Sequence, residues 1–322
     1  MDGIQRAPLH LVTDQAKPKI WAIGGGKGGV GKSLIASSLA YSVARYGHKT
    51  VVIDLDLGGA NLHTVLGLEP PKKGIADFIF DRSASLADCV QPTPYPNLEA
   101  ITGAHDDLKV TKITQAKLDL LISQIKTLNA EIVIIDLGAG TSSYTLDFFN
   151  IADIGILAGL PEPTSIENAY RFIKAVYFDR LARTPELAAV KDLIEATTVA
   201  HNPYGLHTPT DLLNEIALRN RDLALVMKKM VGDFKPKLLL NQARSQADID
   251  VGYSMKAVCK KYFGFDLEYL GYLDYDSSVW QSVRRKRPIM VEFPNSKLSS
   301  TIERVSNYLL KQSRITGNAP GR

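Results

Sequence analysis

Short apolar runs alternate along this chain with longer segments whose apolar residues recur at helical spacing. Valine, isoleucine and leucine dominate the runs, and polar residues stand mainly at their ends. A continuous apolar run of this length is typical of a strand that is buried on both faces of a parallel sheet. We therefore expect strands at residues 20–23, 50–55, 98–102, 131–136, 151–158, 237–240 and 269–273.

Helices are expected between these runs. Residues 34–46 are rich in alanine and leucine, and Gly47 follows them as a C-cap. Residues 118–128 place apolar side chains on one face, residues 209–230 form a further helical segment, and residues 298–309 carry an apolar stripe. Strands that alternate with helices predict an α/β fold: a doubly wound, mainly parallel sheet with helices on both faces.

A glycine-rich stretch, Gly24–Ser33, lies between the first expected strand and the first expected helix. Its sequence fits the phosphate-loop (P-loop) template at Gly26, Gly31, Lys32 and Ser33. Glycines let backbone N–H groups surround a phosphate, and the helix N-terminus adds partial positive charge. The template assigns Lys32 to the β- and γ-phosphates and Ser33 to Mg²⁺. Nucleotide contacts are expected from Gly26, Lys27, Gly28, Gly29, Val30, Gly31, Lys32, Ser33 and Leu34.

A second lysine in the loop, Lys27, goes beyond the general template. The phrase Lys-Gly-Gly-Val-Gly-Lys-Ser, residues 27–33, resembles the deviant Walker A motif of the MinD/ParA family of ATPases. The resemblance implies a P-loop fold, ATP and Mg²⁺ as ligands, and an active homodimer that encloses two ATP molecules. It also implies that Lys27 crosses the dimer interface and contacts nucleotide held by the partner subunit. A lysine that is only solvated is the alternative.

Three aspartates stand at or just after the ends of two expected strands. They are Asp54 and Asp56 near the end of 50–55, and Asp136 at the end of 131–136. The carboxyl ends of parallel strands meet in one crevice beside the P-loop, so we expect these side chains to lie together. Asp136 has the Walker B pattern, in which an apolar strand carries a carboxylate to the Mg²⁺ side of the site.

The resemblance to the MinD/ParA family gives the other aspartates roles. It implies that Asp56 positions the attacking water and that Asp54 supports the Mg²⁺ shell, although strand capping is an alternative for both. The predicted catalytic residues are Lys27, Lys32 and Asp56, and the predicted metal ligands are Ser33, Asp54 and Asp136.

Adenine recognition is implied in the same way. The family carries an asparagine that pairs with adenine at the position of Asn241. Its usual proline near the base is replaced here by Asp274, which puts that wall of the pocket in doubt.

Short phrases elsewhere are similar to the flagellar-number regulators of this family, the FlhG/FleN type. They are Asp14-Gln15-Ala16 near the N-terminus, Phe293–Ser296 near the C-terminus, and Pro161–Tyr170, in which Thr164 or Ser165 is expected to cap a helix. The resemblance spans residues 19–310 apart from an insertion. We expect a flexible arm at 1–18, the ATPase domain at 19–313 and a tail at 314–322.

The insertion, at about 179–235, is longer than the connection usual in the family. An insertion of this length is either a lid or partner-binding surface, or a locally packed elaboration. His201 and His207 lie in it without a carboxylate or cysteine at ligand spacing, so we expect no metal there.

Charge and cysteine content bear on the cellular compartment and on the partners of the protein. The 322 residues carry a formal net charge of +4, which neither demands nor excludes an anionic partner. Two isolated cysteines, Cys89 and Cys259, indicate a reducing compartment. We find no export signal and no apolar run of 18 residues, so we expect a cytoplasmic protein, with peripheral attachment to the membrane open.

Two surface features bear on partners. The basic stretch 283–288 is suited to DNA phosphates, acidic lipid or a protein, or is a solvated helix end. The apolar stripe of 298–309 permits membrane insertion, but it lacks bulky aromatic residues, so we expect it to dock on the domain body.

These observations lead to three hypotheses. The first is a MinD-like ATPase of the flagellar type, slow and stimulated by a protein partner, that controls the number or placement of a surface structure. The second is a ParA-like partitioning ATPase that binds nonspecific DNA. The third is a nucleotide-sensing scaffold without catalysis, in which the insertion carries the function.

Overall fold

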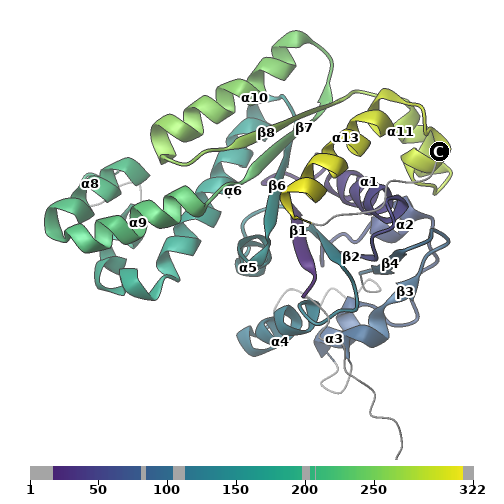
Figure 1. Ribbon diagram of the computed structural model, residues 1–322, viewed down its shortest axis with the longest axis horizontal. Helices are drawn as coiled ribbons and strands as arrows, with labels where there is room; N and C mark the ends of the chain where they lie inside the picture. Colours follow the sequence, from purple (N-terminus) through teal and green to yellow (C-terminus); the bar gives the residue numbers. More distant parts are fainter. Residues whose placement is uncertain (1–16, 81–84, 104–112, 198–203, 207, 315–322) are drawn as a thin grey trace, which may run out of the picture.

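The computed structural model of the protein describes residues 17–80, 85–103, 113–197, 204–206 and 208–314. Within them eight strands form one sheet, in the order β3-β4-β2-β5-β1-β6-β7-β8 (Figure 1). All neighbours are parallel except β3 and β4. The strands are β1 Lys19–Gly24, β2 Thr50–Leu55, β3 Gln91–Pro92, β4 Leu98–Ile101, β5 Ile132–Leu137, β6 Ile154–Gly159, β7 Lys237–Ala243 and β8 Glu268–Asp274.

The order of the strands reverses around β1, which lies between β5 and β6 in the middle of the sheet. In a doubly wound sheet the ligand crevice opens at the carboxyl ends of the strands beside such a reversal. The register of β2 and β5 places Asp54 opposite Asp136 at this edge. The topology therefore brings the predicted carboxylates to the end of β1, where the P-loop begins.

Helices cover both faces of the sheet (Figure 1). Helices α1, α2, α11, α12 and α13 pack on one face, and α3 to α6 and α10 pack on the other. Their bounds are α1 Lys32–Arg45, α2 Leu62–Leu66, α3 Ile75–Phe80, α4 Gln115–Ile125, α5 Ser143–Ile151, α6 Pro163–Ala182, α10 Gln246–Val258, α11 Ser278–Arg284, α12 Ile289–Glu292 and α13 Lys297–Gln312.

The central strand shows why the apolar runs are continuous. Trp21 and Ile23 of β1 enter the core beneath α1 and α13, whereas Ile20 and Ala22 enter the core on the opposite face. A strand that is covered on both sides needs apolar residues at every position. The predicted α/β fold, a mainly parallel doubly wound sheet, is confirmed.

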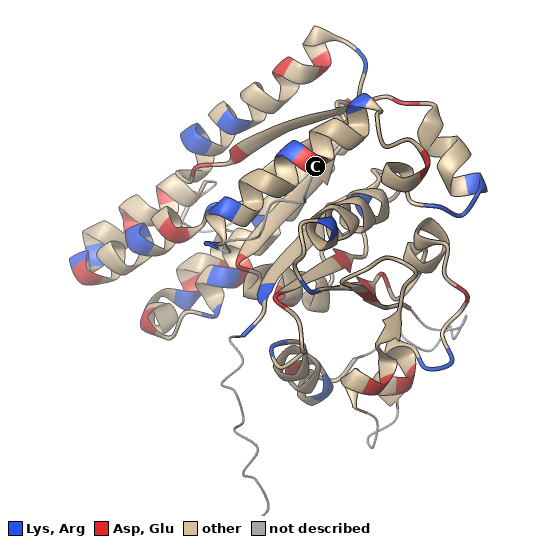
Figure 2. Ribbon diagram, turned by 45° about the vertical axis from the view of Figure 1, so that its right-hand side comes forward, with Lys and Arg blue, Asp and Glu red and all other residues tan. Residues whose placement is uncertain are grey.

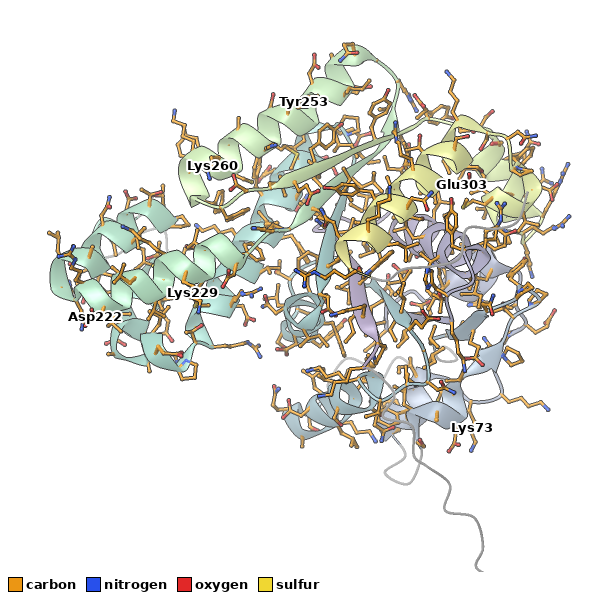
Figure 3. All side chains as sticks on the ribbon, in the orientation of Figure 1. Lys73, Asp222, Lys229, Tyr253, Lys260 and Glu303 are labelled. Atoms are coloured by element: carbon orange, nitrogen blue, oxygen red, sulfur yellow. The ribbon has the colours of Figure 1, made fainter. Side chains whose placement is uncertain are left out.

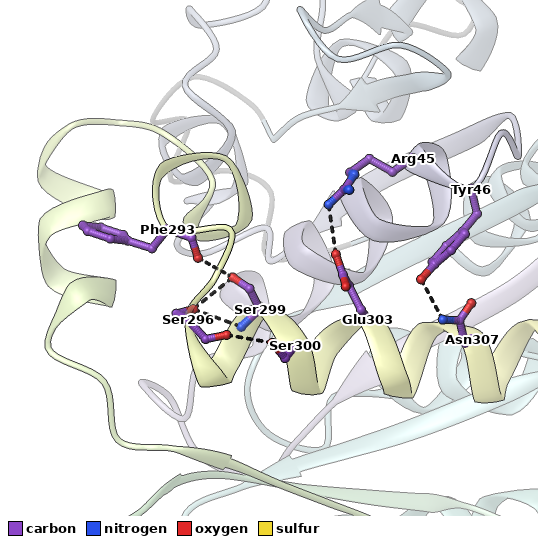
Figure 4. A network of polar contacts seen from close by, with 8 residues as sticks. All are labelled: Arg45, Tyr46, Phe293, Ser296, Ser299, Ser300, Glu303 and Asn307. Carbon is purple, nitrogen blue, oxygen red and sulfur yellow. Dashed lines mark hydrogen bonds and ion pairs between the residues drawn. The ribbon is translucent and has the colours of Figure 1, made fainter. Parts of the chain in front are cut away.

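The C-terminal stripe lies against the domain body. Leu298, Ile302, Val305 and Leu309 of α13 are all buried in the core that α13 shares with α1. Polar contacts hold the same two helices together (Figure 4): Arg45 pairs with Glu303 at 2.9 Å, and Asn307 donates to the Tyr46 hydroxyl at 2.6 Å. The expectation that this helix docks on the domain is confirmed.

The segment 209–230 forms two helices, which corrects the single helical segment expected there. Asn220 separates α8 (Pro209–Arg219) from α9 (Arg221–Asp233). Its backbone is extended, and its Oδ1 accepts from the N–H groups of Asp222 and Leu223 at 3.0 and 3.1 Å. Asparagine in this conformation starts a new helix.

The region expected as an insertion is mostly helical in its described part. Helix α6 continues to Ala182, and η2 (Pro185–Val190), α7 (Lys191–Ala196), α8 and α9 follow it. Two strand expectations also change. The strand expected from residue 151 begins at Ile154 because α5 runs to Ile151, and the short antiparallel β3 was not expected at all.

Candidate functional site

The P-loop connects β1 to α1 at the centre of the carboxyl edge of the sheet. Gly29 and Gly31 have φ angles of 75° and 93°, a left-handed conformation that glycine adopts without steric cost. Gly31 is the N-cap of α1, and among the described side chains none caps this helix. The N–H groups of the first turn are therefore free to bind an anion, which the helix dipole also favours.

Lys32 is the first residue of α1, and its side chain is 93% buried, since its exposed fraction is 7%. Its ammonium donates to the carbonyl of Lys27 at 3.4 Å. Burial lowers the pKa of Lys32, while the negative charges of Asp136 and Asp56 raise it. The ammonium thus lies between the loop and two carboxylates, where a nucleotide phosphate would complete its coordination.

Asp136 is buried on β5, and neither of its carboxylate oxygens has a hydrogen-bond partner among the described residues. Burial raises the pKa of Asp136 well above its usual value, the charge of Asp54 adds to the rise, and Ser33 and Lys32 oppose it. A buried carboxylate without partners calls for an explanation, and a hydrated cation beside it supplies one.

Mg²⁺ fits this arrangement. It usually keeps several waters and needs only one or two protein oxygens besides the substrate phosphates. Accordingly, no cluster of three His, Cys, Asp or Glu residues capable of holding a metal by itself occurs in the described part of the chain. Ser33 and Asp136 therefore remain the predicted ligands, with the nucleotide phosphates completing the shell.

Asp54 has a different surrounding. Its two oxygens accept the backbone N–H groups of Asp56 and Leu62, each at 3.0 Å. Leu62 begins α2, so the side chain fixes the whole loop from 56 to 62, and the capping role considered for Asp54 is present. Its predicted support of the Mg²⁺ shell stays a prediction.

Burial raises the pKa of Asp54 to about 6, although its two backbone hydrogen bonds oppose the rise. The folded protein therefore holds this proton more tightly than the unfolded chain, where an aspartate has a pKa of about 3.9. The protonated Asp54 side chain therefore contributes to the free energy of unfolding below pH 4, and this stabilisation is lost as the pH rises through about 6. We expect the nucleotide-free protein to lose on the order of 3 kcal/mol of unfolding free energy from this group.

The measurement is denaturant unfolding between pH 4.5 and pH 7 for the wild type and for Asp54→Asn. The stability difference should move in favour of the variant as the pH rises, because asparagine does not titrate. A difference that is the same at every pH would contradict the raised pKa of Asp54.

Asp56 lies over the glycines that follow the Walker B strand. A Cβ added to Gly138 would stand 3.3 Å from its Oδ1, and the side chain is partly exposed. It is near enough to affect the pKa of both Lys32 and Asp136. The structure thus brings Asp56 to the predicted site, and its role in positioning water stays a prediction.

Lys27 points away from its own loop and contacts the start of α6. Its ammonium donates to Thr164 Oγ1 at 3.0 Å and lies 3.5 Å from a carboxylate oxygen of Glu162. About a third of the side chain is exposed, 36%. These two partners were not predicted from the sequence, although the end of β6 beside β1 could have indicated them.

The start of α6 also corrects the expected cap. Glu162 is the N-cap residue, and no side-chain hydrogen bond caps this helix among the described residues. The Ser165 hydroxyl instead accepts from the N–H of Leu160 at 2.8 Å, and the Thr164 hydroxyl accepts from Lys27. Pro163 at the first helical position removes one N–H that would otherwise need a cap.

Asn241 is buried at the end of β7 and holds the P-loop from the side. Its Nδ2 donates to the carbonyl of Val30, and its Oδ1 accepts from the N–H of Gln242, both at 2.9 Å. A Cβ on Gly31 would come 2.3 Å from this Nδ2, which is a second reason for glycine there. Adenine pairing by Asn241 stays a prediction. Asp274, which replaces the family's usual proline, is the last residue of β8, and β7 separates this strand from β6.

Glu292 partly neutralises the basic stretch 283–288, whose Lys and Arg residues are blue in Figure 2. Arg285 and Arg287 both pair with Glu292, and the guanidinium of Arg284 lies 4.7 Å from the ring centre of Trp280. These contacts agree with a helix end that is stabilised locally. Separately, the helices of the described residues include none with both the length and the apolarity to cross a bilayer.

Some predictions fall outside the described residues. These are the triplet Asp14–Ala16, the two histidines His201 and His207, and the tail from residue 315. The bounds of the arm, the domain and the tail stay predictions for the same reason. Cys89 and Cys259 are both buried free thiols.

Comparisons with known proteins agree with this site. The antiactivator FleN of Pseudomonas aeruginosa is 28% identical over 291 residues, which are 89% of this chain and 85% of that protein. The flagellum site-determining protein YlxH of Helicobacter pylori is 32% identical over 169 residues, 52% of this chain; the match spans only 56% of that relative. Septum site-determining proteins MinD also match over about half of the chain.

Solved structures show the same fold. MinD of Pyrococcus horikoshii with Mg-ADP superposes with a TM-score of 0.62 at 21% identity, over 92% of this chain and 98% of that one. MinD of Aquifex aeolicus, solved in a MinC:MinD complex, gives 0.61 at 19% identity, over 91% and 96%. At these identities the likeness establishes the fold alone.

The family assignment rests on the match to a family model. Residues 21–289 match the CobQ/CobB/MinD/ParA nucleotide binding domain, and this range contains the P-loop, the three aspartates and Asn241. The resemblance to the MinD/ParA family, which the deviant Walker A phrase predicted, is thereby confirmed. The chain belongs to the CobQ/CobB/MinD/ParA nucleotide-binding family.

Proposed function

We propose that this protein is an ATP-hydrolysing switch that dimerises with ATP and regulates the number or placement of flagella. The observation that carries the proposal is the position of buried Lys32 close enough to Asp136 for the two charges to interact, while neither oxygen of this buried carboxylate has a hydrogen-bond partner among the described residues. A charge pair left open in this way suits a phosphate and its cation. Membership of the nucleotide-binding family supports the same ligand.

In the proposed reaction this chain binds the nucleotide phosphates, orients the attacking water and neutralises the charge of the transition state. The P-loop N–H groups and Lys32 hold the phosphates, and Ser33 and Asp136 hold Mg²⁺. Bound Mg²⁺ would neutralise charge that develops on the phosphate oxygens. Asp56 orients the attacking water from above Gly138, and the ammonium groups stabilise the charge of the transition state.

Lys27 gives the switch its dependence on a second subunit. In the structure its ammonium donates to Thr164 and lies beside the carboxylate of Glu162, at the outer side of the loop. The pair with Glu162 is exposed, and such pairs contribute about 1 kcal/mol at most. The lysine can therefore leave these partners for an anionic phosphate across a dimer interface at little cost.

The test is the mass of the Asp56→Ala protein in solution, measured by light scattering with Mg·ATP and with Mg·ADP. Loss of the water-positioning carboxylate should trap ATP and give a dimer, whereas ADP should leave a monomer. Adding Lys27→Ala should abolish the dimer with ATP while nucleotide binding persists. Equal masses with both nucleotides would refute the switch.

The flagellar role rests on the names of the relatives. FleN is called an antiactivator and YlxH a flagellum site-determining protein. We infer a cytoplasmic protein, slow in turnover and stimulated by a protein partner, which attaches peripherally to the membrane if at all. The alternatives of DNA partitioning and of a non-catalytic scaffold are not favoured, because two of the relatives reported above, YlxH and MinD, are named for determining the site of a flagellum and of a septum.

A further inference from the structure

Helix α10 and the π-helical turn η3 (Cys259–Phe263) that continues it carry an exposed stripe, here called the α10 stripe. Its members are Asp250, Tyr253, Ala257 and Lys261. The spacing i, i+3, i+7 and i+11 places them on one face of the helix. All four are exposed, Tyr253 to 61% of its surface, whereas Gly252, Met255 and Cys259 on the opposite face are buried in the domain.

The α10 stripe lies beside β8, the last strand of the sheet. The ring of Tyr253 packs edge-on against the ring of Tyr269 in β8, with 5.1 Å between the ring centres. Among the described strands β8 has no neighbour on its outer side. Figure 3 shows Tyr253 midway along α10, at the outer boundary of the molecule. This part of the surface is therefore accessible to a second protein.

The two ends of the α10 stripe carry opposite charges. Asp250 accepts from the amide of Gln246 at 2.9 Å. Neither Asp250 nor Lys261 makes an ion pair with another described residue, whereas the neighbouring Lys260 is paired with Asp266. The stripe thus presents one acid and one base, both available for an ion pair, and has no net charge of its own. A partner that fits it must carry the same two charges in the reverse order.

The order of the side chains along the stripe is complementary to itself when it is read in the opposite direction. In an antiparallel pair of stripes Asp250 lies opposite Lys261 of the second copy, and Tyr253 lies opposite Ala257. Both pairs are centred near Met255, so one two-fold axis satisfies them together, and each contact is made twice. A large ring opposite a methyl group packs as a knob into a hole.

From this complementarity we propose that the α10 stripe is a docking surface for a second copy of this chain, whose own α10 packs antiparallel against it across a two-fold axis. Two register irregularities interrupt the pairing of β8 with β7, and bulged edge strands avoid pairing with other sheets. We therefore assign the contact to the helices and not to hydrogen bonds between two β8 edges. One pair of helices makes an interface at the small end of the specific range, so a Kd of roughly 10–100 µM is expected.

The α10 stripe is separate from the face that would enclose ATP. The P-loop follows β1, and both β6 and β7 lie between β1 and β8. A subunit with two separate two-fold faces can use both at once, so ATP dimers would join through α10 into tetramers or longer chains. This second step rests on the proposed function, whereas the docking of two nucleotide-free copies does not.

The test is sedimentation equilibrium of the full-length protein without nucleotide, from roughly 1 to 300 µM, which brackets the expected Kd. The average mass should rise from that of a monomer toward that of a dimer. Asp250→Lys and Lys261→Glu should each weaken the association at least about tenfold, because the two-fold axis brings two pairs of like charges together. The double variant should restore the wild-type Kd to within about threefold, which a structural role of either residue would not produce.

Matched variants elsewhere separate the α10 stripe from the rest of the surface. Lys229→Glu changes the net charge as Lys261→Glu does, but on the exposed side of α9, and should leave the Kd unchanged. Ala257→Arg fills the space for Tyr253 of the second copy and should abolish the association, whereas Ala217→Arg on the exposed side of α8 should not.

Three results would overturn the interface. They are a monomer at every concentration, a dimer that is insensitive to Lys261→Glu and Ala257→Arg, and a double variant as weak as the single ones. The first of these would leave the stripe to a different protein.

The joining of ATP dimers has its own readout. With Mg·ATP the Asp56→Ala protein should be a dimer at about 1 µM, below the expected Kd of the α10 stripe, and larger than a dimer at about 100 µM. Lys261→Glu should return the larger species to a dimer. Masses that stop at the dimer would overturn the joining step alone. If Asp56→Ala never dimerises at the low concentration, the proposed function has failed, while the nucleotide-free measurement still decides on the stripe.

Discussion

Replacing Asp136 with asparagine should slow ATP hydrolysis by at least about 100-fold and at the same time stabilise the nucleotide-free protein. The loss of rate follows from removing a charge that holds Mg²⁺ against the phosphates. The gain in stability follows because this carboxylate is buried, opposite Asp54 in the sheet register, and without partners among the described residues. Replacing the buried charged carboxylate with a neutral amide removes the cost of burying its charge, which should add about 1–3 kcal/mol to the free energy of unfolding.

The measurement pairs a phosphate-release assay with denaturant unfolding in the absence of nucleotide. Asp119→Asn, on the exposed face of α4, serves as the matched control and should change neither quantity. A variant that loses activity and also stability would show that Asp136 is paired in the free protein. The proposed cation role would then lose the observation on which it depends.

A substitution that lowers activity but raises stability indicates that the native side chain is present for function and not for folding. Asp54 shows the contrast within the same site. Its two oxygens accept from backbone N–H groups, so it organises the loop from 56 to 62, whereas the oxygens of Asp136 accept no hydrogen bond from any described residue. Asp54 and Asp136 are both buried and lie opposite each other on neighbouring strands, but Asp54 organises a loop, whereas Asp136 is the proposed Mg²⁺ ligand.

The sequence predicted well what depends on short stretches of chain. The strands, the P-loop with its left-handed glycines and the stripe of α13 follow from periodicity and glycine content within about fifteen residues. The break between α8 and α9 was missed because the pattern of apolar residues continues across Asn220, while the decisive event is a side-chain hydrogen bond to Leu223. Periodicity carries no information about such a cap.

The sequence could not predict which atoms of distant segments contact one another. Asn241 is 211 residues from the carbonyl of Val30 that it binds, and Thr164 is 137 residues from Lys27. Family resemblance supplied roles for Asn241 and Lys27 in a nucleotide-bound dimer. The contacts of Asn241 with Val30 and of Lys27 with Thr164 join segments that are distant in the chain, so only the structure shows them.

Gly26→Ala is expected to have the second large effect. An added Cβ would stand 2.1 Å from the carbonyl oxygen of Asn168 and 2.6 Å from its carbonyl carbon, both backbone atoms of α6. Neither can rotate away, so the loop or the helix must move. We expect a loss of about 1–3 kcal/mol in the free energy of unfolding and at least tenfold weaker ATP binding.

Gly28→Ala is the matched control for stability, because a Cβ there meets no atom within 4 Å. Both variants carry the same methyl group in the same loop, so the difference between them, by thermal unfolding without nucleotide and by ATP titration, isolates the contact with α6. If Gly26→Ala is as stable as Gly28→Ala, the loop is not seated on α6. In that case Lys27 could not be positioned by this helix.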